Sequence, residues 1–240
     1  MVTPPGVGGP GGAVSVEPRH ITIERRVRFA VLEPRERPAT EIWFALHGYH
    51  QLAHRFLRHF QPIQRGARCI VAPEGLHRHY IDGESRRVGA SWMTSEDRLT
   101  DIDDYVGYLD RLHAHILAEE SRQTSGGSAP PRIVGLGFSQ GVHTLCRWLA
   151  FGRARIDRAI LWGSTVPPDL DLSAHGDTLS AADLHLVVGD EDEYFDRAAI
   201  DAHEARLSVA GVAFTSHTYP GGHRLDAGTL RRLAEPGERG

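Results

Sequence analysis

The chain alternates between short apolar runs and longer stretches in which apolar residues recur every three or four positions. Short runs bounded by Gly, Pro and charged residues are typical of strands, and the second spacing is typical of amphipathic helices. The predicted strands span residues 20–32, 41–46, 68–72, 132–138, 158–162, 184–188 and 212–219. The predicted helices span residues 52–60, 97–118, 141–151, 198–209 and 227–233. Strands that alternate with helices predict an α/β fold, with a mostly parallel central sheet covered by helices on both faces.

The pattern predicts one domain with a short tail at each end. Residues 1–18 are rich in Gly and Pro and lack periodic apolar positions, so we expect a flexible tail there and another over residues 235–240. We therefore expect residues 19–234 to form a single α/β domain, since an α/β chain of this length often has one hydrophobic core. Residues 74–95 predict a long loop of the kind that is usually functional in a compact domain. Residues 121–131 predict a Gly/Ser/Pro linker at the surface.

Composition and charge exclude several functions. The net charge is −4 and arginines are interspersed with acids, so no basic stripe predicts nucleic-acid binding. All 27 basic residues are arginine, which excludes a catalytic lysine, a Schiff-base lysine and a phosphate-binding Walker-A lysine. We expect a cytoplasmic protein without a membrane span, because neither a signal peptide nor an apolar run of about 20 residues is present. Cys69 and Cys146 lie in apolar stretches without metal or redox spacing and are expected to be buried free thiols.

The residues Gly137-Phe138-Ser139-Gln140-Gly141 match the pattern G-x-S-x-G of a nucleophile elbow. A predicted strand precedes the pattern and a predicted helix follows it, as the motif requires. The sharp turn leaves little room for side chains two positions either side of the serine, and glycine meets that limit. The turn also places the Ser139 hydroxyl at the positive end of a helix, which favours developing negative charge. Ser139 is therefore the candidate nucleophile.

A serine nucleophile requires a histidine to accept its proton and a carboxylate to orient that imidazole. In α/β-hydrolases the three residues follow the chain order serine, acid, histidine. The histidines after the serine are His143, His175, His185, His203, His217 and His223. His223 alone follows the last predicted strand, behind the turn Tyr219-Pro220-Gly221-Gly222, where it can reach the carboxyl edge of the sheet. The others fall in predicted helices, strands or a polar loop, so His223 is the candidate base.

The acid should lie in the run Gly189-Asp190-Glu191-Asp192-Glu193, where the strand 184–188 ends. Asp190, Glu191 and Asp192 all remain candidates on position alone. The D-x-D spacing also suits Ca²⁺, but no glycine-containing calcium loop follows, so an orienting acid is favoured.

Two backbone N–H groups are candidates for the oxyanion hole. The residues Leu46-His47-Gly48-Tyr49 end an early predicted strand, where α/β-hydrolases take their second oxyanion donor. The N–H groups of Tyr49 and Gln140 would together stabilise a tetrahedral oxyanion. We expect His47 to support this loop and not to act as a base.

These motifs resemble the phospholipase/carboxylesterase group of α/β-hydrolases, which includes acyl-protein thioesterases and small bacterial carboxylesterases. The resemblance rests on LHG at 46–48, GFSQG at 137–141, the G-x-x-D of Gly189 to Asp192, and GGH at 221–223. It implies the α/β-hydrolase fold from about residue 20 to 233, Asp192 as the orienting acid, and oxyanion donors at Tyr49 and Gln140. The chain departs from the group at Tyr49-His50, at residues 193–195 and in the loop 74–95, which surround the acyl pocket and leave the substrate open.

Further candidates concern the substrate pocket and a metal. His79, Tyr80, Trp92 and Trp162 are candidates for the pocket wall. His50 and His54 have the spacing of a zinc-binding pair on a helix, but no nearby Asp, Glu or Cys completes a set, so no metal site is predicted.

The sequence therefore predicts a serine hydrolase that cleaves a small carboxylic ester or thioester through an acyl-enzyme on Ser139. His223 serves as base, Asp192 orients it, and no cofactor is expected. The alternatives are an acyltransferase or peptidase that uses the same triad, and a non-catalytic binding protein on the hydrolase fold. The sequence predicts neither the acyl chain nor the oligomeric state.

Overall fold

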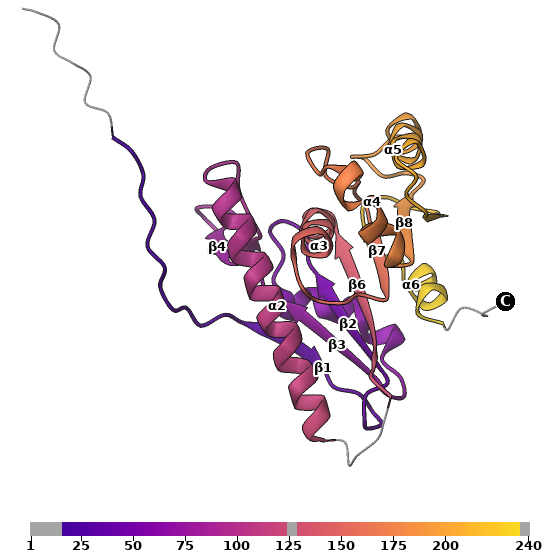
Figure 1. Cartoon of the computed structure of the whole chain (residues 1–240), viewed down its shortest axis with the longest axis horizontal. Coiled ribbons are helices and arrows are strands. Elements are labelled where there is room, and N and C mark those ends of the chain that lie inside the picture. The colour runs from indigo at the N-terminus through magenta and orange to yellow at the C-terminus, as the bar shows by residue number, and fades with distance from the viewer. Residues whose placement is uncertain (1–15, 124–128, 236–240) are drawn as a thin grey trace, which may run out of the picture.

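The computed structural model describes residues 16–123 and 129–235, and a seven-stranded sheet runs through them (Figure 1). The strand order is β1-β3-β2-β6-β7-β8-β9. β1 pairs antiparallel with β3, and every other neighbouring pair is parallel. In this order the strands are β1 (Phe29–Leu32), β3 (Arg68–Pro73), β2 (Glu41–Leu46), β6 (Arg132–Phe138), β7 (Arg158–Trp162), β8 (Leu184–Gly189) and β9 (Thr215–Tyr219). The expected mostly parallel sheet is confirmed.

Helices cover both faces of the sheet. One face carries α2 (Arg98–Arg122), α3 (Gln140–Phe151), α4 (Leu172–Ala181) and α5 (Arg197–Val209). The other face carries α1 (Ala53–Phe56), the 3₁₀ helix η1 (Leu57–Ile63) and α6 (Ala227–Ala234). In Figure 1, α2 and α3 cross in front of the strands. Each face therefore has its own apolar core, and the sheet separates the two.

The alternation of side chains along β2 explains why its sequence is a continuous apolar run. Ile42, Phe44 and Leu46 pack into the core beneath α2 and α3. Trp43 and Ala45 point the other way and pack into the core beneath η1 and α6. Successive residues of a strand face opposite sides of a sheet, so a strand buried on both sides needs an apolar residue at every position.

The N-terminal strand is shorter than predicted. Residues 16–28 have no regular secondary structure, and only 29–32 of the predicted strand 20–32 pairs with a neighbour. Ile21 and Ile23, whose alternation suggested the strand, are 87% and 73% exposed. Their alternation has no partner strand and no core to face, so the prediction for residues 20–28 is wrong. Arg28 holds the end of this segment to the body through hydrogen bonds of 2.9 and 2.8 Å to Glu74.

The predicted loop 74–95 contains a hairpin, and one helix was not predicted. β4 (His77–Tyr80) pairs antiparallel with β5 (Val88–Ser91) in a separate two-stranded sheet. α4 lies between β7 and β8, where no helix was expected. Asp171 was the available sequence signal for the start of α4, because aspartate is a favoured N-cap residue. Its side chain accepts a hydrogen bond from the backbone N–H of Ser173.

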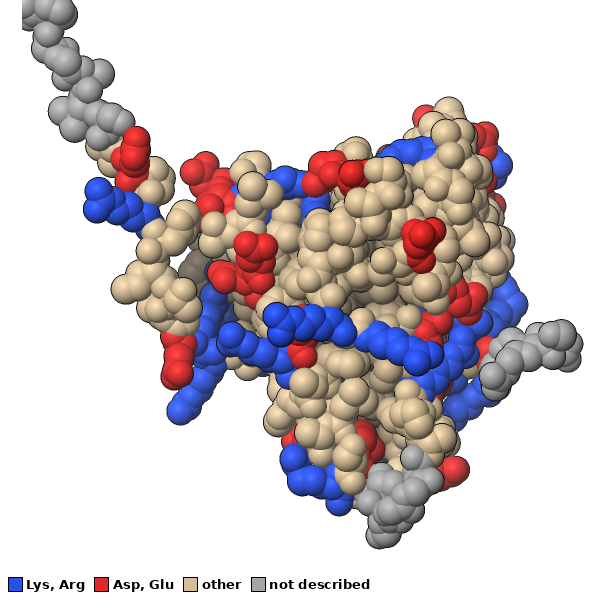
Figure 2. All heavy atoms as spheres, in the orientation of Figure 1, with Lys and Arg blue, Asp and Glu red and all other residues tan. Residues whose placement is uncertain are grey.

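Several further expectations concern the ends and the surface of the chain. Most of the predicted tails, and residues 124–128 of the predicted linker, lie outside the described residues, and α2 extends to Arg122 into that linker. Cys69 and Cys146 are buried and unpaired. Within the described part of the chain, no helix is both long and apolar enough to cross a bilayer. Figure 2 shows arginines and acidic residues interspersed on one face of the molecule.

Candidate active site

Ser139 occupies a sharp turn between β6 and α3. Its φ and ψ angles are 53° and −118°, a combination that non-glycine residues rarely adopt. Glycine is required on one side because a Cβ at Gly141 would lie 2.2 Å from the carbonyl oxygen of Leu46. A Cβ at Gly137 would lie 2.4 Å from the carbonyl oxygen of Gly141. The two glycines therefore allow the turn to close against the end of β2, and Ser139 is presented at the start of α3.

Asp192 and His223 are joined by a hydrogen bond at the same edge of the sheet. Asp192 follows β8 and His223 follows β9, and the neighbouring strands bring them together. His223 Nδ1 lies 2.9 Å from Asp192 Oδ2, and the Asp192 side chain is fully buried. A carboxylate can only accept, so Nδ1 carries the proton and Nε2 keeps a free lone pair.

The imidazole of His223 lies beside the elbow. Its ring centroid is 4.9 Å from that of Phe138, the residue before Ser139. The backbone N–H of Ser139 donates to the carbonyl oxygen of Trp162 at 2.9 Å, which fixes the elbow against the neighbouring strand. Ser139 Oγ itself has no hydrogen-bond partner among the described residues, so the Asp192–His223 pair forms no hydrogen bond to the serine in this structure.

The acidic residues next to Asp192 form different hydrogen bonds in the same turn. Asp190 Oδ1 accepts a hydrogen bond of 2.9 Å from the backbone N–H of Gly221, so Asp190 holds the loop that carries His223. Glu191 is exposed, and its backbone N–H donates to the carbonyl oxygen of Gly221 at 3.0 Å. Of the three acids left open by position, only Asp192 reaches the His223 ring.

His47 orients the peptide unit between Gly48 and Tyr49. Its Nε2 accepts from the backbone N–H of Gly75 at 3.0 Å, so its Nδ1 carries the proton and donates to the carbonyl oxygen of Gly48 at 2.8 Å. Burial lowers the pKa of His47 to about 4, which keeps the ring neutral. Because a trans peptide is planar, fixing the carbonyl of Gly48 also fixes the direction of the Tyr49 N–H. The structure thus supports the expectation that His47 props this loop.

The two N–H groups predicted for the oxyanion hole belong to segments next to Ser139. A Cβ at Gly48 would be 3.2 Å from Ser139 Cβ, so the loop that carries Tyr49 is in contact with the elbow. Gln140 is the first residue of α3, whose initial N–H groups have no partner within the helix. Neither the Tyr49 nor the Gln140 N–H has an acceptor among the described residues.

The side chain of Gln140 joins the elbow to the segment after β5. Its Oε1 accepts from the backbone N–H of Trp92 at 3.2 Å, and its Nε2 donates to the carbonyl oxygen of Met93 at 3.0 Å. An amide side chain provides both a donor and an acceptor, which explains why glutamine suits this position. The role of this side chain was not predicted from the sequence.

The four predicted pocket residues occupy three kinds of place. Trp92 and Trp162 are fully buried; the indole N–H of Trp92 donates to the carbonyl oxygen of His47, and that of Trp162 to the carbonyl oxygen of Arg224. The two indoles are therefore hydrogen-bonded to the loops that carry His47 and Arg224. His79 lies at the surface beside Tyr49, with ring centroids 5.4 Å apart. Tyr80 is 68% exposed and points to the opposite face of β4 from His79.

The remaining histidines do not form a metal centre. His50 Nδ1 and His79 Nε2 lie 2.7 Å apart as a hydrogen-bonded pair, whereas His54 is exposed on α1. In the described part of the chain, no three His, Cys, Asp or Glu side chains form a group that could hold a metal ion.

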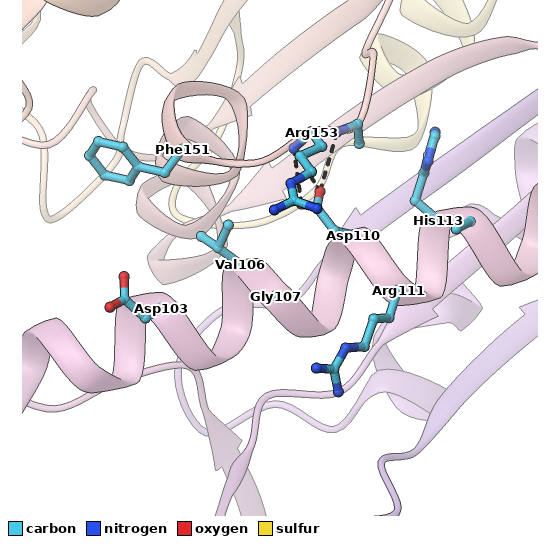
Figure 3. Close-up of a pocket in the computed structure, with 10 residues that line it drawn as sticks. Asp103, Val106, Gly107, Asp110, Arg111, His113, Phe151 and Arg153 are labelled. Carbon is cyan, nitrogen blue, oxygen red and sulfur yellow. Dashed lines mark hydrogen bonds between the residues drawn. The ribbon is translucent and has the colours of Figure 1, made fainter. Parts of the chain in front are cut away.

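A cavity of about 640 Å³ lies away from Ser139 (Figure 3). It runs along the middle of α2 and the far end of α3, where Phe151 lies about 17 Å from the start of the helix by its rise per residue. Figure 3 shows Asp110 pointing at the backbone of Arg153, to which it is hydrogen-bonded at 2.9 and 3.0 Å. Asp110 therefore fixes the chain just after the C-terminus of α3. The cavity is separate from the candidate active site, which lies at the other end of this helix.

Comparison with known proteins supports the fold. No sequence-family model and no curated protein sequence matches the chain. Solved structures do match, among them Zea mays acyl-protein thioesterase 2, which is 14% identical with a TM-score of 0.63 over 86% of this chain and 96% of that one. A carboxylesterase from Mesorhizobium loti is 18% identical with a TM-score of 0.62 over 83% and 90% of the two chains. Esterase PE8 is 19% identical with a TM-score of 0.58 over 87% and 96%.

The chain has the α/β-hydrolase fold. Two contacts at the candidate base were not predicted from the sequence. Glu193 Oε2 accepts from the backbone N–H of His223 at 3.2 Å, and the ring of Tyr194 meets the His223 ring edge-on with centroids 4.7 Å apart. Their adjacency to Asp192 was the available signal.

Proposed function

We propose that the protein is a serine hydrolase that cleaves carboxylic esters or thioesters through an acyl-enzyme on Ser139. The observation that carries the proposal is the buried Asp192–His223 hydrogen bond of 2.9 Å beside a serine held at a positive φ. The matching folds of carboxylesterases and an acyl-protein thioesterase agree with this reaction class. A single domain over residues 19–234 and a small-molecule substrate belong to the same proposal.

In the first half-reaction, Nε2 of His223 accepts the proton of Ser139 as Oγ bonds to the carbonyl carbon. The resulting oxyanion is stabilised by the N–H groups of Tyr49 and Gln140. His223 then gives the proton to the leaving alcohol or thiol as its bond to the acyl carbon breaks. Asp192 holds the imidazole in the tautomer that keeps Nε2 free and stabilises the imidazolium.

In the second half-reaction, water replaces the leaving group. His223 accepts a proton from water as the water oxygen bonds to the acyl carbon. Ser139 Oγ recovers this proton from His223 when its bond to the acyl carbon breaks and the carboxylic acid departs. The chemistry requires no cofactor. If an alcohol or amine replaced water at this step, the same site would be a transferase, which is the alternative left open by the sequence.

Covalent labelling tests the proposal directly. A fluorophosphonate probe should label the wild type and fail to label Ser139→Ala, and p-nitrophenyl acetate hydrolysis should be lost together with labelling. His115→Ala, which changes an exposed residue of α2, is the matched control and should retain both. A wild type that is folded yet neither labelled nor active would overturn the enzyme assignment in favour of a binding protein.

A further inference from the structure

His143 and Ser164 form a polar pair beside Ser139. Ser139 directly precedes α3, and His143 lies in the first turn of that helix. Ser164 follows Gly163, where a Cβ would be 3.0 Å from His223 Cε1. His143 Nε2 and Ser164 Oγ are 3.4 Å apart, and both side chains are only partly buried. The pair therefore borders both the nucleophile and the base, and the mechanism above does not use it.

Charged residues extend this pair along α3. Arg147, one turn further on, is buried and hydrogen-bonded through Nη2 to Asp169 Oδ1 at 3.0 Å and through Nη1 to the sulfur of Met93 at 3.2 Å. Arg98 also forms an ion pair with Asp169. We call His143, Ser164, Arg147, Asp169 and Arg98 the polar cluster.

The surroundings keep His143 neutral. Burial, then the positive charges of Arg147 and Arg98, lower its pKa to about 4, while Asp169 opposes the change. A neutral imidazole has one N–H, and Ser164 has one O–H. Their mutual contact uses one of these two donors, whichever tautomer is present, and the other donor is not used within the pair.

We propose that the polar cluster is the acyl subsite of the enzyme, and that it selects short acyl groups with a hydrogen-bond-accepting oxygen close to the carbonyl. The inference rests on the proposed function. The ring of Tyr194 meets the His223 ring edge-on. We assign the leaving group, which receives its proton from His223, to this side of the imidazole and the acyl group to the α3 side. A long alkyl chain placed there would desolvate polar groups without replacing their hydrogen bonds, which is unfavourable.

A pair of isosteric esters tests this selectivity. In p-nitrophenyl methoxyacetate an ether oxygen replaces one CH₂ of p-nitrophenyl butyrate. The quantity measured is the ratio of kcat/KM for the two esters, compared between the wild type and His143→Leu, because the comparison cancels their different intrinsic reactivity. We expect the ratio to fall about tenfold in His143→Leu or in Ser164→Ala, as loss of one hydrogen bond worth about 1.4 kcal/mol would give. His115→Leu is the matched control and should leave the ratio unchanged.

The outcomes separate this inference from the proposed function. A wild type that hydrolyses both esters, with a ratio unchanged in both variants, would overturn the acyl subsite alone. A wild type that is inactive and unlabelled by the fluorophosphonate would overturn the reaction and the subsite together. If the variants instead changed the ratio for 2-methoxyethyl acetate against butyl acetate, the cluster would contact the alcohol, and the acyl assignment would be wrong.

Discussion

Acid should destabilise the fold through His47, because this buried ring must remain neutral. Its Nε2 accepts from Gly75 and its Nδ1 donates to Gly48, so a second proton would place an N–H against an N–H and leave a buried charge. The ring is fully buried, and its pKa is about 4 compared with an ordinary value of 6.5. The perturbation is therefore a fall in pH from 7 to 5.

The size of the effect follows from linkage between protonation and folding. Below pH 6.5 the unfolded chain binds a proton at His47 that the folded chain refuses, so stability is full above that pH and is lost as pH falls toward 4. The difference between the two pKa values corresponds to about 3 kcal/mol at its limit, of which about 2 kcal/mol is lost between pH 7 and pH 5. His143 and His203 have their pKa lowered to about 4 as well, so the whole protein loses more than this.

A variant isolates the part due to His47. Gln can donate and accept at this position but does not titrate, so His47→Gln should lose about 2 kcal/mol less than the wild type between pH 7 and pH 5. Urea unfolding followed by tryptophan fluorescence at the two pH values gives both free energies. His54→Gln, at an exposed position of α1, is the control and should behave as the wild type. Equal losses in the wild type and His47→Gln would refute the reasoning.

Three further substitutions test the candidate site. Asp192→Asn keeps the shape of the side chain, but its amide can donate to His223 Nδ1 and favour the tautomer that carries the proton on Nε2. The kcat for p-nitrophenyl acetate should therefore fall about 10⁴-fold, and a change in KM alone would contradict this. Gln140→Ala retains the backbone N–H but releases the segment after β5, so kcat should fall about tenfold, and an unchanged kcat would show that the tether is dispensable. Ser139→Gly relieves the positive φ and should be about 1 kcal/mol more stable than Ser139→Ala; equal unfolding free energies would argue against stored strain.

The buried strands could be predicted closely from the sequence. The expected ranges 41–46, 132–138 and 158–162 coincide with β2, β6 and β7. These strands lie in the middle of the sheet and are buried on both faces, so each is a continuous apolar run that ends at a turn. Local sequence is sufficient where burial alone decides the structure.

Elements that depend on distant partners could not be predicted in this way. β4 has the sequence His77-Arg78-His79-Tyr80, and its pairing with β5 makes it a strand. β5 is in turn bridged to Gln51 through Ala90. The opposite failure occurs at Ile21 and Ile23, which alternate like a strand but find no partner. In both cases tertiary contacts override the local pattern.

The acidic run after β8 shows the same limit within the candidate site. Such a run is ordinarily a solvated turn, and its sequence alone does not distinguish one acid from the next. In the folded chain Asp190 binds the N–H of Gly221, Asp192 binds the ring of His223, and Glu193 binds the N–H of His223. A Cβ at Gly189 would lie 2.0 Å from the carbonyl oxygen of Gly221, so the two loops could not approach closely enough for these bonds if any other residue preceded the acids. The position of the imidazole is therefore set by the whole run and by the glycine before it, and not by Asp192 alone.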